Sequence, residues 1–137
     1  LRVLPNNRFR GFLMIKVIHV EDDDDIRELV ELSLKISDEF EVLSCASGIE
    51  AMSAVGAFKP DLLLLDVMMP NMNGVETLEN IRSLEGYSKI PAIFVTARAG
   101  VDKNKELFEA GALGVIVKPF EVATLAEQIL TIFDGIN

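Results

Sequence analysis

Five side chains that could bind a phosphate or a metal ion each follow an apolar run of the sequence. Asp66 closes a run of four consecutive leucines, and Glu21, Asp22, Thr96 and Lys118 close three other runs. Such runs, without polar alternation, are typical of strands buried on both faces of a parallel sheet. The carboxyl ends of parallel strands meet at one edge of the sheet, where ligands bind. The sequence therefore predicts three carboxylates, one hydroxyl and one ammonium group at a single edge.

This set of groups favours chemistry on a phosphoryl group. Three clustered carboxylates repel one another unless a cation lies among them, and a few hard oxygen ligands that leave room for water suit Mg²⁺. Asp66 could then attack phosphorus and carry an acyl phosphate, while Thr96 and Lys118 bind the phosphoryl oxygens. Each residue alone is weak evidence, because a lone threonine or lysine at a strand end is usually structural or solvated.

The elements that must position these groups alternate strand and helix five times. Strands are predicted at about 15–20, 41–46, 62–66, 90–95 and 114–118. Helices are predicted after the acidic cluster at 21–25, from Ser47, over about 74–85, over about 102–110, and in the last segment from Val122. Short connections imply right-handed crossovers and a parallel sheet covered on both faces. We predict an α/β, flavodoxin-like, doubly wound (βα)5 three-layer sandwich with strand order 2-1-3-4-5.

The helices carry apolar residues at helical spacing. The first helix is predicted to use Ile26, Leu29, Val30 and residues 33–36 inward, and the last helix has a clear 3.6-residue stripe. Ser47 and Glu50 have the spacing of a capping box.

Length and composition indicate one domain without a membrane-spanning helix. The 137 residues are 50% hydrophobic, and no apolar run approaches the ~20 residues that cross a bilayer. Nothing resembles a secretory signal, so the sequence predicts a cytoplasmic protein. Residues 14–137 carry 10 basic and 22 acidic residues, which argues against binding nucleic acid directly.

Residues 1–13 differ from the rest in charge and pattern, because they contain three arginines and no acid. We interpret them as an N-terminal extension, either upstream of a natural start at Met14 or introduced by cloning, with the folded domain over 14–137. A short docking arm is the alternative.

Two further residues invite a functional reading. His19, the only histidine, lies within the first predicted strand and is interpreted as a packed core side chain, not a catalytic base. Cys45, the only cysteine, excludes an intramolecular disulfide and is interpreted as a core residue.

Four motifs taken together carry a family resemblance. VEDDDDIREL, DLLLLDVMMPNMNG, VTAR and VKPF, in this order, resemble receiver domains of two-component response regulators, of the chemotaxis-regulator kind, over residues 14 to about 134. The resemblance implies that Asp66 is the phosphoacceptor. It also implies that Mg²⁺ binds Glu21, Asp22, Asp66 and the backbone carbonyl of Met68.

The same resemblance assigns Thr96 as the switch hydroxyl and Lys118 as the phosphate-contacting lysine, and it implies a cis Lys118–Pro119 bond. It implies a signalling phosphoacceptor and not a metabolic enzyme. The phosphodonor would be a sensor histidine kinase or a phosphotransfer domain, and the downstream protein partner is unknown. Family members often pair through the last two helices, although this sequence does not fix an oligomeric state.

The chain departs from the family pattern at three positions. Glu21 opens the acidic pair where aspartate is commoner, and Asn73 precedes Gly74 where aspartate is usual. Val115 stands where receivers carry Tyr or Phe, whose ring turns inward when the switch threonine moves. The valine puts the coupling from Thr96 to the surface in doubt.

Other functions fit less well. A receiver-like scaffold that acts without phosphorylation is the main alternative, and Val115 supports it. A hydrolase with an aspartyl-phosphate intermediate lacks a dedicated second acid. A flavin-binding domain would not place acids after the first strand, and 22–25 lacks the glycine that a calcium loop needs.

Overall fold

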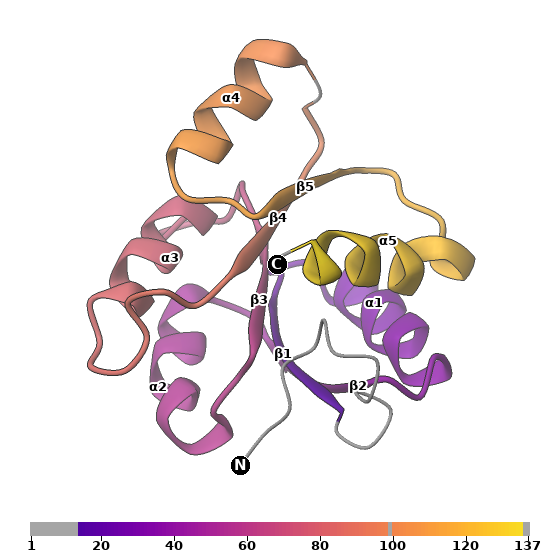
Figure 1. Ribbon diagram of the computed structural model, residues 1–137, viewed down its shortest axis with the longest axis horizontal. Coiled ribbons are helices and arrows are strands. Elements are labelled where there is room, and N and C mark those ends of the chain that lie inside the picture. Colours follow the sequence, from indigo (N-terminus) through magenta and orange to yellow (C-terminus); the bar gives the residue numbers. More distant parts are fainter. Residues whose placement is uncertain (1–13, 99, 136–137) are drawn as a thin grey trace.

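The computed structural model describes residues 14–98 and 100–135, which form five strands and five helices in strict alternation (Figure 1). Most predicted bounds lie within one or two residues of those in the structure. The elements are β1 Ile15–Val20, α1 Asp24–Ile36, β2 Phe40–Cys45, α2 Gly48–Phe58, β3 Leu62–Asp66, α3 Gly74–Arg82, β4 Ala92–Thr96, α4 Val101–Glu109, β5 Gly114–Val117 and α5 Val122–Asp134.

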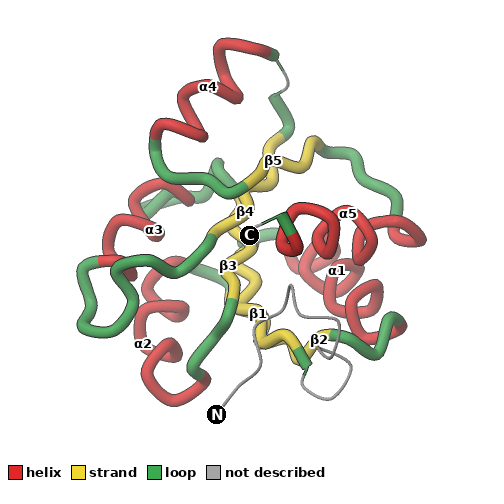
Figure 2. Tube along the Cα trace, in the orientation of Figure 1, coloured by secondary structure: helices red, strands yellow, loops and turns green. Residues whose placement is uncertain are grey.

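The five strands form one parallel sheet in the order β2-β1-β3-β4-β5, which confirms the predicted fold. The central strand β3 is buried along its whole length, as its leucine run predicts. Helices α1 and α5 cover one face of the sheet, and α2 and α3 cover the other (Figures 1 and 2). The first and third strands are neighbours, so their carboxyl ends lie side by side.

Caps in the sequence fix where several helices begin. Asp23 accepts hydrogen bonds from the backbone amides of Asp25 and Ile26 at the start of α1. Ser47 accepts from the Glu50 amide, but the Glu50 carboxylate accepts from Ala46 instead of closing the predicted reciprocal box. These side chains satisfy amides that the first helical turn leaves without partners.

Helix α3 is fastened at both ends. Asn73 and Glu76 form a reciprocal capping box at its start. At its end the Arg82 guanidinium donates to the carbonyl oxygens of Ile90, before β4, and Gly111, before β5, at 2.9 and 3.2 Å. Arg82 therefore ties α3 to the amino ends of two strands.

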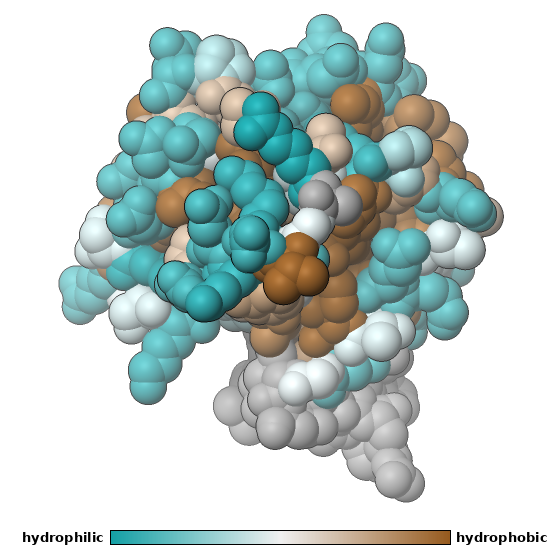
Figure 3. Space-filling view, turned by 90° about the horizontal axis from the view of Figure 1, so that it is seen from above, coloured by the Kyte–Doolittle hydropathy of each residue, from teal (hydrophilic) through white to brown (hydrophobic). Residues whose placement is uncertain are grey.

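Helix α4 stands apart from the other helices in Figure 1. Leu107 is its one buried residue, and Val101 and Phe108 are exposed. Gly100 at its start has φ 143° and provides no side-chain cap. Figure 3, which views the molecule from the α4 end, shows apolar residues gathered in a band between hydrophilic areas.

The predicted inward face of α1 was partly wrong. Ile26, Val30 and Leu34 pack into the core, but Leu29 and Ile36 are 46% and 69% exposed. The apolar arc of this helix is wider than the surface that the sheet and α5 can cover.

Candidate functional site

The predicted side chains do gather at the carboxyl edge of the sheet. Glu21 directly follows β1, Asp66 and Thr96 end β3 and β4, and Lys118 directly follows β5. Val20 pairs with Leu65, and Asp66 pairs with Val95, so the strand ends are level with one another. Glu21, Asp66 and Thr96 are buried. Buried apolar strands thus deliver polar groups to one location.

Lys118 links the two buried carboxylates. Its Nζ lies 2.8 Å from Glu21 Oε1 and 2.9 Å from Asp66 Oδ1. The other Glu21 oxygen, Oε2, accepts from the backbone amide of Asp23 at 3.1 Å. The lysine therefore compensates two negative charges that burial would otherwise make costly.

The acidic groups are close enough to share a cation. One carboxylate oxygen each of Glu21, Asp22 and Asp66 lies within 4.8 Å of the others, and Asp22 is exposed. All three donors are hard oxygens, which suit Mg²⁺, and the exposed side of the cluster gives water access to the remaining coordination positions. The donor set fits the predicted metal. The backbone of Met68 follows two residues after Asp66, and its side chain is exposed.

Burial and charge act in opposite directions on the ionisation of this cluster. Burial raises the pKa of Asp66 and of Glu21, and hydrogen bonds from Lys118 counteract the increase in both. Burial lowers the pKa of Lys118, but its hydrogen bonds to the two carboxylates outweigh burial and raise it. The lysine stays charged while it is paired.

Thr96 is held in the turn that leaves β4. Its Oγ1 accepts a hydrogen bond from the Arg98 amide at 3.0 Å, and its carbonyl accepts from the Lys118 amide at 2.7 Å. The second bond ties β4 to the start of the β5–α5 loop. The Lys118–Pro119 bond in that loop is cis, as predicted.

Gly74 fits against the backbone of β3. A Cβ atom at this position would lie 2.3 Å from the Asp66 carbonyl oxygen, far inside van der Waals contact. The Gly74 amide donates to the Val67 carbonyl at 3.0 Å. The sequence indicated only a turn at Asn73–Gly74; the close approach of α3 to Asp66 depends on tertiary packing.

His19 is buried in the sheet, as predicted. Burial, with smaller contributions from the charges of Lys118 and Arg27, lowers its pKa to about 3. The imidazole is neutral at physiological pH and lies within the strand, which fits a core side chain. Cys45 is also buried, and burial raises the pKa of its thiol to about 11. A thiol of this kind is inert.

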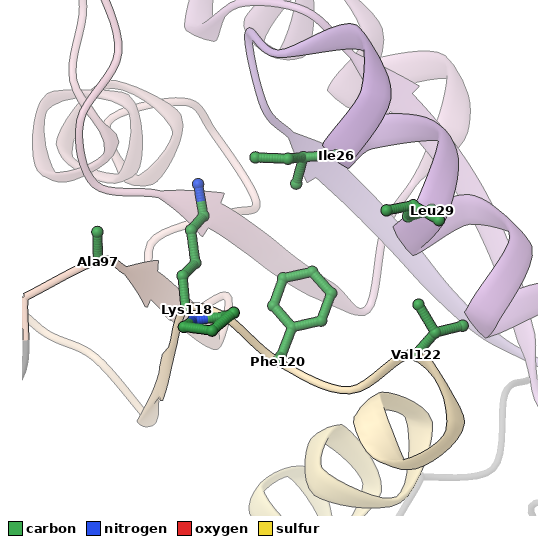
Figure 4. Close-up of a pocket in the computed structure, with 7 residues that line it drawn as sticks. Ile26, Leu29, Ala97, Lys118, Phe120 and Val122 are labelled. Atoms are coloured by element: carbon green, nitrogen blue, oxygen red, sulfur yellow. The ribbon is translucent and has the colours of Figure 1, made fainter.

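An apolar hollow of about 320 Å³ lies beside the site, and the sequence did not indicate it. Figure 4 shows Phe120 between Lys118 and Val122, opposite Ile26 and Leu29 of α1. Phe120 follows the lysine and proline of the VKPF motif, which is the one signal that could have suggested an apolar wall here. Lys118 therefore borders both the acidic cluster and an apolar surface.

Val115 is partly buried in β5 and packs against the core on the α2 and α3 face. Its side chain is too small to fill the space of an aromatic ring. Across the described ranges 14–98 and 100–135, no helix has the length and apolar character to span a bilayer.

Comparisons with known proteins agree with the geometry. Residues 17–130 match the family model of the response regulator receiver domain. The transcriptional regulatory protein CseB of Streptomyces avermitilis is 40% identical over 113 residues, which cover 82% of this chain and 46% of that protein. The transcriptional regulatory protein PrrA of Mycobacterium tuberculosis is 33% identical over 119 residues, covering 87% of this chain and 50% of that protein. The chain thus spans about half the length of these curated relatives.

Solved structures give the same family. The chemotaxis protein CheY4 of Vibrio cholerae superposes with a TM-score of 0.80 and 32% identity, over 87% of this chain and 98% of that one. A response regulator described as putative, from Chloroflexus aurantiacus, has a TM-score of 0.78 and 31% identity, over 88% and 98%.

Proposed function

The chain belongs to the response regulator receiver domain family, and we propose that it accepts a phosphoryl group on Asp66 and changes its affinity for a partner in response. The observation that carries this proposal is the pairing of one buried carboxylate with Lys118 at 2.9 Å, inside a cluster of acids that one cation could bridge. Among the described residues at this edge, Asp66 alone combines burial, a lysine partner and the end of the central strand.

The residues have separate roles in the proposed transfer. An Asp66 oxygen attacks phosphorus, the bond from phosphorus to the donor breaks, and its electron pair leaves with the donor. Lys118 and the Thr96 hydroxyl bind the phosphoryl oxygens. Glu21, Asp22, Asp66 and the Met68 carbonyl would hold Mg²⁺, which offsets negative charge as the phosphoryl group approaches.

The donor in this proposal is a phosphohistidine of a sensor histidine kinase or a phosphotransfer domain. Lys118 and the apolar hollow beside it give a protein donor both a charged and an apolar surface close to Asp66. We propose that the reaction occurs in the cytoplasm and that the output is a protein contact, because the acidic surface opposes direct binding of nucleic acid. The relatives are named as transcriptional regulators, which supports a partner or domain that controls transcription as the receiver of the signal.

The test is phosphorylation by a small donor. The protein is incubated with Mg²⁺ and acetyl phosphate, and intact mass is followed with time. Wild type is expected to gain one phosphoryl group, and Asp66→Asn none. Asp38→Asn is the matched control: Asp38 is an exposed aspartate in the turn between α1 and β2, with φ 61°, a conformation that asparagine also tolerates.

Two outcomes would contradict the proposal. An equal mass gain in Asp66→Asn would place the acceptor elsewhere. No gain in any variant, with Mg²⁺ binding shown by NMR, would favour a scaffold that acts without phosphorylation. Val115, which lacks the ring that usually couples the switch threonine to the surface, is the observation that supports this second function.

A further inference from the structure

Helix α1 carries a second apolar surface that points to solvent. Leu29, Leu32 and Ile36 are 46%, 53% and 69% exposed and follow one another at spacings of three and four residues, which places them on one side of the helix. We call these three residues the α1 stripe. Leu29 also lines the apolar hollow, so the stripe and the hollow form a continuous surface. Clustered exposed apolar side chains of this kind are a feature of protein interaction sites.

Acidic side chains border the α1 stripe. Asp25 and Glu28 are exposed on the same helix, and a shallow groove contains Glu28, Glu31, Leu32 and Lys35. Lys35 pairs with Glu31 at 2.9 Å, which neutralises the one basic group in the groove. The surface therefore suits an occupant that is both apolar and basic.

Residues 1–13 have this composition. They include arginines at three positions, no acid, and six large apolar side chains: Leu1, Val3, Leu4, Phe9, Phe12 and Leu13. The segment joins the described fold at Met14, and the next amide, that of Ile15, donates to the Glu39 carbonyl just beyond the end of α1. It is thus tethered near Ile36.

The segment is long enough to cover the whole stripe. Thirteen extended residues span at most about 45 Å, whereas the 13 residues of α1 span about 20 Å. A tether this short keeps the effective concentration near millimolar, so modest contacts suffice. A second copy of the chain is a weaker candidate, because residues 14–137 carry 10 basic and 22 acidic residues and would repel one another.

We propose that residues 1–13 bind along the α1 stripe, with their apolar side chains on Leu29, Leu32 and Ile36 and their arginines beside Asp25 and Glu28. The proposal concerns a contact within one chain and does not depend on phosphoryl transfer. It depends on the basic and apolar side chains of residues 1–13.

Limited proteolysis of the full chain tests the contact. Trypsin cuts after Arg2, Arg8 and Arg10, and a bound segment is cut only in the fraction of molecules that release it. The double variant Leu32→Ser, Ile36→Ser is expected to be cut about tenfold faster at these arginines. Val101→Ser is the control, because it removes an even more exposed apolar side chain, on α4, and should leave the rate unchanged.

A second measurement reports the contact directly. In wild type, NMR should show nuclear Overhauser effects between the rings of Phe9 or Phe12 and the methyl groups of Leu32 or Ile36. Equal cleavage rates in wild type and the double variant, together with no such effects, would overturn the proposal. A dimer in sedimentation equilibrium that the double variant abolishes would also overturn it, because the stripe would then bind a second copy.

Discussion

Helices α3 and α4 have nine residues each but differ in how firmly they are held. Helix α3 has a reciprocal capping box, four buried residues and Arg82 as a tie to two strands. Helix α4 has an uncapped start and Leu107 as its one buried residue. The first helix supports the Asp66 loop, and the second follows the Thr96 loop. We therefore expect α3, beside Asp66, to open less readily than α4, which follows Thr96.

The largest effect is expected at the contact between α3 and β3. Gly74→Ala places a methyl group 2.3 Å from the Asp66 carbonyl, so α3 or β3 must shift. We expect a loss of about 3 kcal/mol in the free energy of unfolding, measured by urea denaturation. Gly56→Ala in α2 is the control, since a Cβ there meets nothing within 4 Å and alanine favours the helix. Equal stability of the two variants would mean that α3 does not brace Asp66.

Truncation of one buried leucine to alanine in each helix compares α3 and α4 directly. Leu78→Ala in α3 should cost about 3 kcal/mol of unfolding free energy, because the rigid surroundings cannot close the cavity. Leu107→Ala in α4 should cost about 2 kcal/mol, because a weakly held helix can shift into the space. The difference is measured by denaturant titration of both variants. A greater loss from the α4 substitution would reverse the comparison.

Hydrogen exchange compares the local stability of α3 and α4 without any substitution. Amides of α4 are expected to exchange at least about tenfold faster than those of α3, which corresponds to about 1.4 kcal/mol in local opening. Residue-resolved exchange at constant pH, monitored by NMR, measures this. Equal protection in the two helices would show that α4 is held by contacts as strong as those of α3.

The smallest effect on stability is expected from Val115→Phe. The residue is partly buried in an edge strand, so the change in unfolding free energy should stay within about 1 kcal/mol. If the missing ring limits coupling, the variant should show larger amide shifts in α4 than wild type when a beryllofluoride analogue binds. Val117→Phe, at an exposed position of the same strand, controls for added bulk. Identical shifts in Val115→Phe and wild type would show that a ring at position 115 is not the limiting element.

The sequence predicted the fold and brought together the residues of the site because both depend on local patterns. Apolar runs define buried strands, and the residue that ends each run must lie at the same edge as the others. This reasoning placed Glu21, Asp66, Thr96 and Lys118 together, although their roles stay predictions until phosphorylation is tested.

The features that the sequence did not predict depend on tertiary packing, that is, on which surfaces contact one another in the fold. The apolar spacing of α1 indicated an inward face but not its limits, so Leu29 and Ile36 were assigned inward although they are exposed. The hollow beside Phe120 involves residues far apart in the chain, and the close approach of Gly74 to Asp66 depends on how α3 packs against β3. No local pattern encodes such distances.

The hydrogen bonds from Arg82 have a mechanical consequence for α4. By binding the Gly111 carbonyl, Arg82 anchors the point where the chain leaves α4, while Gly100 leaves the entry to the helix without a cap. If Thr96 moved, we would therefore expect the amino end of α4, at Val101, to shift further than its carboxyl end.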